Sequence, residues 1–314
     1  MARDSRGLAR ALTAADRELQ RLGRAPRTRE DVLAETRRFL AATGRAARAV
    51  RREDVVRYLA AAQRRGVTGR TQQNALTLLR MFFRALVTAG AVRADPTADV
   101  PFPQAGEPAR LAVSEQGARA LLVSSSTPAE RRHGQATVDA RTALARARRD
   151  RAALEVLFGL GVRSSEARTA RVADLDLANG TLLVRRAKRG EVERLPLPPA
   201  ALPHVASYAL DARRLLLGQA PDHGLLLVRD DGRPFTYGSA LNVLVSRVAR
   251  RAGVRAHPHA LRRGLATALV RRGASLPVVQ ALLGHKDLAV VAAYVLVDKD
   301  DLRRAVEALE LERR

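Results

Sequence analysis

A proline-rich stretch, ADPTADVPFPQAGEP, occupies residues 94–108 and constrains the fold more than any other segment. It has four prolines and no hydrophobic periodicity, and proline cannot continue a helix because its ring removes the amide donor. Three segments before it each carry an apolar stripe at helical spacing and end at a glycine, namely 28–44, 52–66 and 71–90. We therefore predict a helical N-terminal domain at 1–105 and a second domain at 106–314.

The second domain is predicted to be mainly helical with one small sheet. Helical patterns cover 114–123, 138–159 and most of the chain from Ala200, interrupted at DDGRPF, and the polar stretch 124–135 is expected to be an exposed loop. Asn179-Gly180 is a strong hairpin signal, and a second turn is expected at 188–191. The expected fold class is mainly α, with three antiparallel strands at 175–178, 181–186 and 192–197.

The charge of the chain points to a polyanionic partner. Of its 56 basic residues 53 are arginine, and with 32 acidic residues the net charge is +24, spread over both halves of the sequence. Such a charge repels itself unless a polyanion relieves it. A genome rich in G and C, which favours arginine codons, is an alternative source of the excess. Aromatic residues are only 3% of the chain, which argues against single-strand binding by base stacking.

Several classes of protein are disfavoured by absent features. The chain has no cysteine, so disulfides and thiol catalysis are excluded. Its first residues, MARDSRGLAR, do not resemble a signal peptide, and no apolar run reaches the length of a membrane helix. We expect a cytoplasmic protein without a membrane partner.

Two candidate site residues lie in the middle of the chain. Arg163 follows Gly159 and Gly161, which should end one helix, and Ser164 or Ser165 could cap the next, so Arg163 is placed near a helix N-terminus suited to an anion. Lys188 is one of only three lysines, and a lysine, unlike an arginine, can give up its proton as a general acid. In a chain so rich in arginine, a solvated surface role is the alternative for both.

Four more candidates lie between residues 257 and 296. His259 and Arg262 share one face of a helix start, and Gly284 closes the helix PVVQALL so that His285 follows its end. Tyr294 stands in the apolar run DLAVVAAYVLV, where a tyrosine is more often a core residue than a nucleophile.

Together, the six residues supply the groups for phosphoryl transfer on nucleic acid. A tyrosine hydroxyl attacks phosphorus, arginines stabilise the charged oxygens, a lysine protonates the leaving oxygen, and histidines bind the phosphate or move a proton. No carboxylate cluster offers a Mg²⁺ site, so we expect neither a metal nor another cofactor.

These motifs resemble those of the tyrosine recombinases, or phage integrase family, and most closely its compact Xer-like members. GLGVRSSEAR is similar to the first arginine box with Arg163 and the acidic Glu166, RRAKRGEVERLPLP to the lysine hairpin with Lys188, and HPHALRRGLATALVRRGASLPVVQALLGH to the second box with His259, Arg262 and His285. Tyr294 stands at the position of the nucleophile. Residues 52–100 are similar to the helical core-binding domain.

The resemblance implies a site-specific DNA recombinase that forms a 3′-phosphotyrosyl intermediate and a Holliday junction on double-stranded DNA. It implies a SAM-like core-binding domain followed by a catalytic domain, and a homo-tetramer on two sites, alone or with a second recombinase. Both Xer-like dimer resolution, which serves chromosome partition, and integration or excision of a mobile element remain open. A non-catalytic DNA-binding protein on the same fold is the main alternative, and a relative of type IB topoisomerases or telomere resolvases is another. Arg263, where many members have histidine, and the apolar run before Tyr294 depart from the family pattern.

Overall fold

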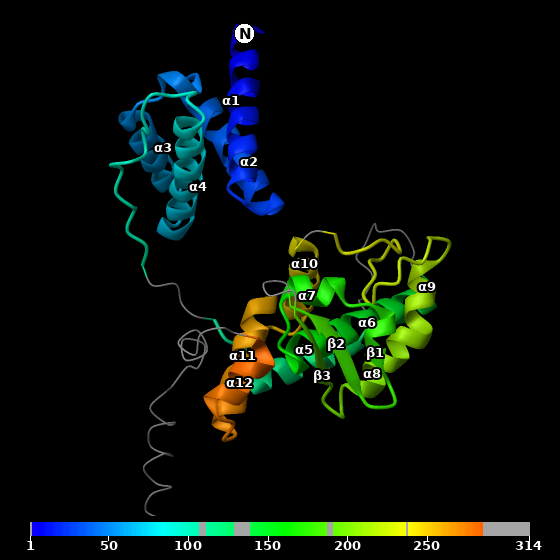
Figure 1. Ribbon diagram of the computed structural model, residues 1–314. Helices are drawn as coiled ribbons and strands as arrows, with labels where there is room; N and C mark the ends of the chain where they lie inside the picture. Colours follow the sequence, from blue (N-terminus) through cyan, green and yellow to red (C-terminus); the bar gives the residue numbers. More distant parts are fainter. Residues whose placement is uncertain (1, 107–110, 129–138, 187–190, 237, 285–314) are drawn as a thin grey trace, which may run out of the picture. The chain divides into compact units, whose positions relative to one another are not determined.

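The computed structural model describes residues 2–106, 111–128, 139–186, 191–236 and 238–284 (Figure 1). The chain divides into two compact units, Met1–Ala109 and Arg110–Arg314. The first unit is helical, and the second combines helices with one small sheet, as the sequence predicts. Among the described residues, no helix combines the length and the apolar character needed to cross a bilayer.

Unit 1 is a bundle of four helices around an aromatic core. The phenyl ring of Phe83 meets those of Phe39 and Phe82 edge to face, and all three side chains are fully buried. The helices are α1 (Ala2–Arg21), α2 (Pro26–Thr43), α3 (Arg52–Arg64) and α4 (Gly69–Thr88). Helix α2 begins at Pro26, two residues before the predicted segment 28–44, because proline is well suited to the first helical turn.

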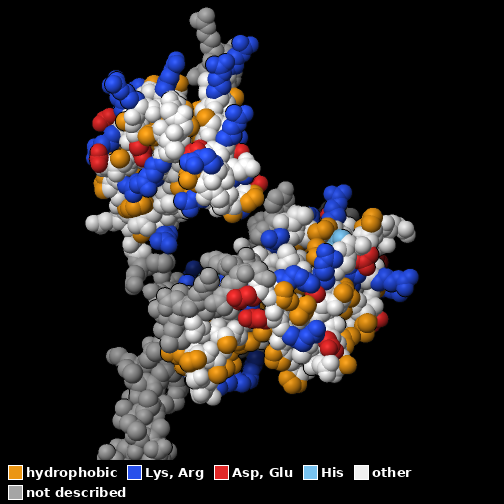
Figure 2. Space-filling view, in the orientation of Figure 1, with side chains coloured by type: hydrophobic (Ala, Val, Ile, Leu, Met, Phe, Trp, Pro, Cys, Tyr) orange, Lys and Arg blue, Asp and Glu red, His pale blue; other side chains and the backbone are white. Residues whose placement is uncertain are grey.

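Helix α1 was not anticipated from the sequence. It packs against α2 and α4, and it contributes Leu12, Ala15 and Leu19 to the core of unit 1. Basic side chains follow its exposed surface in Figure 2, and basic groups are scattered over the visible faces of both units.

The proline-rich stretch begins as part of unit 1. Arg80 of α4 donates hydrogen bonds to the carbonyls of Thr97 (3.4 Å) and Val100 (2.5 Å), and its guanidinium lies 4.3 Å from the ring centroid of Phe102. Gln73 donates to the carbonyl of Pro103 at 2.8 Å. The proline-rich stretch is therefore bound along α4 as far as Pro103.

Unit 2 is built around α6, which contacts α5, α8, α9 and α10. Its core is made mainly of small and aliphatic residues, with Phe235 and a buried tyrosine, Tyr208, whose hydroxyl accepts from the Val228 amide at 3.1 Å. The helices are α5 (Glu115–Ser126), α6 (Ala140–Leu154), α7 (Ser164–Thr169), α8 (Leu202–Ser207), α9 (Arg213–Leu217), α10 (Gly238–Arg251), α11 (Pro258–Arg271) and α12 (Leu276–Leu283).

The sheet is an antiparallel meander of β1 (Leu175–Asp176), β2 (Thr181–Arg185) and β3 (Val192–Pro196). Asp176 pairs with Thr181, so the first turn has four residues and not the two expected from Asn179-Gly180. The Asp176 carboxylate explains the longer turn, because it accepts from the main-chain and side-chain nitrogens of Asn179 at 3.0 and 2.8 Å. Arg185 pairs with Val192 at the far end, and residues 187–190 lie outside the description.

The interruption predicted at DDGRPF is longer in the structure. No helix or strand covers residues 218–236, which are held instead by isolated bridges between Arg171 and Leu225 and between Val228 and Pro234. Buried polar groups, which a periodicity argument cannot detect, anchor this segment.

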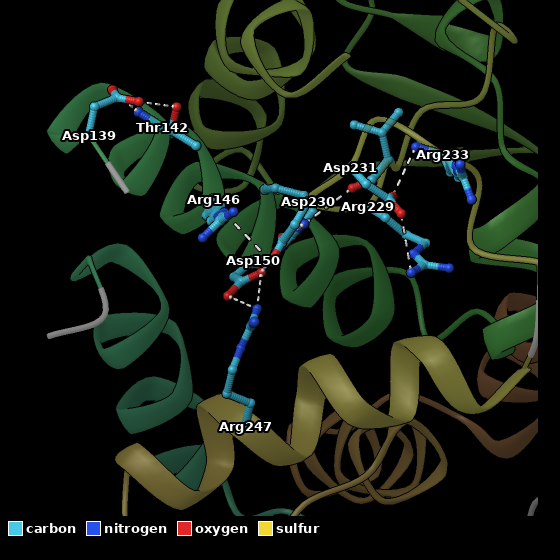
Figure 3. Close-up of polar contacts among 11 residues, drawn as sticks. Asp139, Thr142, Arg146, Asp150, Arg229, Asp230, Asp231, Arg233 and Arg247 are labelled. Carbon is cyan, nitrogen blue, oxygen red and sulfur yellow. Dashed lines mark hydrogen bonds and ion pairs between the residues drawn. The ribbon is translucent and has the colours of Figure 1, made fainter. Parts of the chain in front are cut away.

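One such group is Arg149 of α6, whose guanidinium is buried beside Asp150. Figure 3 shows Arg247 directed at the same carboxylate. Arg149 donates to Asp150 at 2.8 and 3.0 Å and to Asp230 at 2.5 Å, while Arg247 of α10 donates to Asp150 at 2.8 Å. These ion pairs tie α6 both to α10 and to the irregular segment.

We predict that Asp150→Asn destabilises unit 2 by about 3 kcal/mol, because it leaves a buried guanidinium without one of its carboxylates. Urea unfolding of the full chain, with hydrogen exchange of α6 to assign the transition, measures the change. The matched control is Asp211→Asn, whose exposed carboxylate lies 4.0 Å from Arg148. It should cost less than about 1 kcal/mol. Equal losses in the two variants would contradict the role given to Asp150.

Candidate active site

Arg163 and Arg262, the two candidate arginines, meet at the C-terminal end of α12. Helix α12 ends at Gly284, and three successive carbonyls there each accept from a different arginine. Arg186 donates to Leu282 at 2.6 Å, Arg262 to Leu283 at 2.5 Å and Arg163 to Gly284 at 3.4 Å. The last carbonyls of a helix lack internal partners and carry the negative end of its dipole, so they attract cations.

Two glycines make this arrangement possible. Gly161 and Gly284 both have positive φ, +60° in each case, which favours glycine. A Cβ atom on Gly161 would lie 2.6 Å from Leu283 Cδ2, and one on Gly284 would lie 2.8 Å from Arg186 Nε. Arg262, with 1% of its surface exposed, also donates to the Gly161 carbonyl, so its guanidinium joins the two glycine turns.

Arg163 stands at the N-cap of α7, close to the helix start predicted for it. The cap is not a serine hydroxyl as expected, because Glu166 turns back and accepts from the Arg163 amide at 2.8 Å. The other Glu166 oxygen accepts from Arg163 Nη1 at 2.8 Å. The Arg163 side chain keeps 23% of its surface exposed, so it remains open to a ligand.

Glu166 is the buried carboxylate of this cluster. Burial acts to raise its pKa, but the hydrogen bonds from Arg163 and the charges of Arg163 and Arg186 outweigh burial, so the pKa lies below its ordinary value. The carboxylate is therefore ionised at neutral pH and fixes one face of the Arg163 guanidinium.

Arg186 was missed by the sequence analysis. Its side chain is only 1% exposed, and it donates to Glu193 of β3 at 2.7 Å and lies 3.5 Å from Glu166. The signal was present in strand alternation: Leu182 and Val184 face the core, and Arg186 is in phase with them. An arginine at an inward position predicts buried acceptors, although not which ones.

His259 lies in the first turn of α11, on the same helix as Arg262. His257 caps that helix, because its Nδ1 accepts from the Ala260 amide at 3.2 Å. His259 keeps much of its surface exposed, although neighbouring protein atoms desolvate its ring in part. This partial desolvation, and then the charges of Arg263 and Arg262, lower the pKa of His259 to about 4. The ring is therefore neutral at pH 7 and can donate one hydrogen bond.

Three of the six candidates, Lys188, His285 and Tyr294, lie outside the described residues. Their positions in the sequence still relate them to the cluster. Lys188 follows Arg186 by two residues, and His285 follows Gly284 directly. The described part of the site thus brings Arg163 and Arg262 to one turn and places His259 on the helix that carries Arg262.

The cluster can bind an anion with fixed guanidinium groups, which suits the oxygens of a phosphodiester. Among the residues that the structure describes, no group of three or more His, Asp or Glu side chains is arranged to hold a metal ion.

Comparisons with known proteins agree with the motifs. The pattern of the "Phage integrase family" matches residues 136–301, and that of "Phage integrase, N-terminal SAM-like domain" matches residues 27–90. Tyrosine recombinase XerD of Pseudomonas putida is 33% identical over 256 residues, which are 81% of this chain and 80% of that protein. Tyrosine recombinase XerC of Oceanobacillus iheyensis is 30% identical over 257 residues, 81% and 78% of the two chains.

The fold is shared with solved structures at lower identity. A lambda integrase tetramer bound to a Holliday junction superposes with a TM-score of 0.66 at 17% identity, covering 92% of this chain and 77% of the other. The catalytic-domain pattern matches more than half of the chain, and the relatives match most of it at 30% identity or more. The chain therefore belongs to the phage integrase family, as a tyrosine-type site-specific recombinase.

Proposed function

We propose that this recombinase cleaves and rejoins duplex DNA with Tyr294 as nucleophile and with Arg163, Lys188, His259, Arg262 and His285 as the other catalytic residues. The observation that carries the assignment is the α12 turn, where Arg163 and Arg262 meet on consecutive carbonyls. His285 follows that turn directly in the sequence, which supports the assignment of two distant arginines and a histidine to one site. The family motifs and the relatives named XerC and XerD support the same reaction.

The reaction conserves the energy of the phosphodiester. The Tyr294 oxygen attacks phosphorus and passes its proton to His285, while the bond to the 5′ oxygen breaks and Lys188 protonates that oxygen. Arg163 and Arg262 stabilise the charge on the non-bridging oxygens, and neutral His259 donates a hydrogen bond to one of them. The product is a 3′-phosphotyrosyl bond and a free 5′ hydroxyl. The reverse reaction, with a 5′ hydroxyl from the partner strand, completes the exchange.

The assembly and the roles of the two units follow from the same proposal. Unit 1, with its SAM-like pattern, binds the DNA, and unit 2 carries the chemistry. A homo-tetramer acts on two sites, as the lambda integrase tetramer on a Holliday junction suggests by analogy. The similarity to XerC and XerD favours dimer resolution in the cytoplasm over integration of a mobile element.

We predict a covalent protein–DNA adduct that depends on Tyr294. Binding duplexes are first selected from a random library, because the DNA site is unknown, and are then nicked so that the cleaved end diffuses away. In the presence of EDTA the wild type should accumulate an adduct that resists denaturing electrophoresis, and Tyr294→Phe should form none while binding with similar affinity.

An adduct with Tyr294→Phe would assign the nucleophile elsewhere. Binding without any wild-type adduct on the selected duplexes would favour the non-catalytic alternative. As a matched control, Tyr58→Phe changes a tyrosine of α3 in unit 1, whose hydroxyl donates to Glu35 at 2.9 Å, and should leave the adduct unchanged.

We also predict that His259 lowers the stability of the protein in acid. Its folded pKa of about 4 is below the ordinary value of 6.5, so between these values the unfolded chain binds a proton that the folded chain does not. The free energy of unfolding should therefore fall as pH is lowered from about 6.5 towards 4. The free energy of unfolding of His259→Gln should fall by less over the same pH range. Urea unfolding of both proteins at pH 7 and pH 4.5 measures these changes. Identical losses of unfolding free energy in the wild type and in His259→Gln would contradict the low pKa of His259.

A further inference from the structure

We propose that Arg186 is a positioning residue that holds the base of the β2–β3 hairpin against α12 and thereby places Lys188 for proton transfer. This inference rests on the proposed function, because it assigns Arg186 a task in the step that Lys188 performs. Arg186 is not among the six candidate catalytic residues, and its role follows from its contacts.

The contacts of Arg186 extend to three separate elements. Its Nε donates to Glu193 of β3 at 2.7 Å, its Nη1 lies 3.5 Å from Glu166 of α7, and its Nη2 donates to the Leu282 carbonyl of α12 at 2.6 Å. A planar guanidinium can direct its donors in different directions at once, which an ammonium group cannot do in the same geometry. The side chain therefore connects the hairpin to α7, whose N-cap is Arg163, and to α12, whose C-terminal end accepts from Arg163.

The main chain at Arg186 is fixed as well. Its amide donates to the Glu191 carbonyl at 2.8 Å, immediately beyond the last strand pair of Arg185 and Val192. Arg186 thus stands where the chain leaves β2, and Lys188 is two residues further along the connection to β3. Moving the base of the hairpin would move the attachment of Lys188 with it.

Arg186 is poorly suited to bind the phosphate itself. Its side chain is 1% exposed and faces two carboxylates, Glu166 and Glu193, whereas the Arg163 side chain is 23% exposed. Two nearby carboxylates offset its charge, whereas Arg262, which is equally buried, donates to main-chain carbonyls. A buried cation that ties the hairpin to α7 and α12 beside the site is placed to orient other groups.

The proposal predicts a defect that depends on the leaving group. A general acid contributes about 10²–10⁴ in rate, and a loosely held one loses part of that factor. An alkoxide leaving group needs the proton, whereas a thiolate, with a thiol pKa of about 8.5, leaves without it. Replacing the bridging 5′ oxygen by sulfur should therefore relieve a defect in the placement of Lys188, but not a defect in phosphate binding.

The experiment measures single-turnover cleavage by the full-length protein at saturating concentration, on selected nicked duplexes with either bridging oxygen or bridging sulfur. Arg186→Met should cleave the oxygen substrate about 10–100-fold more slowly than the wild type, and the sulfur substrate within about 3-fold of it. Arg186→Lys should cleave the oxygen substrate at a rate between those of Arg186→Met and the wild type. In both variants the Kd for DNA should change by less than about 3-fold. The matched control, Arg185→Met, alters the neighbouring residue that pairs with Asp174, and it should stay within about 3-fold on both substrates.

If Arg186→Met fails to fold by circular dichroism, Glu193→Gln replaces it. This variant loosens only the tie to β3, at a carboxylate that is 32% exposed, and should show the same pattern with a loss of about 3–10-fold. Equal losses on the two substrates, or full activity on oxygen, would overturn the proposal. Failure of the proposed function has a different signature, because then the wild type would form no adduct on either substrate.

Discussion

Three consecutive carbonyls at the end of α12 organise the candidate active site. Each accepts from one arginine, and these arginines come from the α7 cap, from the residue after β2, and from α11. A helix C-terminus is a natural acceptor for cations, and here it collects segments that are 21 to 121 residues distant in the chain. Without α12, the hairpin and the two arginine-bearing helices would lose their shared attachment.

Arginines elsewhere in the interior of unit 2 are likewise stabilised by acceptors from other segments. Arg149, Arg186 and Arg262 are among the largest fully buried side chains of the described residues. Burial of a charge is costly unless carboxylates or carbonyls surround it, and Arg149 and Arg186 each face two carboxylates. These two buried cations of unit 2 are thus paired within the protein.

Sequence reasoning succeeded where local rules decide the structure. Helices α2, α3 and α4, the meander and the closure of α12 at Gly284 follow from periodicity and from turn chemistry, and the structure confirms them. It was less accurate where side chains override those rules. Asp176 lengthens the first turn, Glu166 caps α7 in place of a serine, and α1 adds a helix that was not anticipated.

The sequence by itself determined the family, the order of the candidate catalytic residues and the period of most helices, because these depend on residue type and on spacing along the chain. Only the tertiary structure decided which of the 53 arginines are buried and what they bind. Strand alternation distinguishes Arg186 from its neighbour Arg185, but it does not predict that Arg186 reaches Leu282, 96 residues away, while Arg185 pairs with Asp174 in a partly exposed position. The physical reason is that a buried charge is stabilised by acceptors from distant segments, and local patterns carry no information about those acceptors.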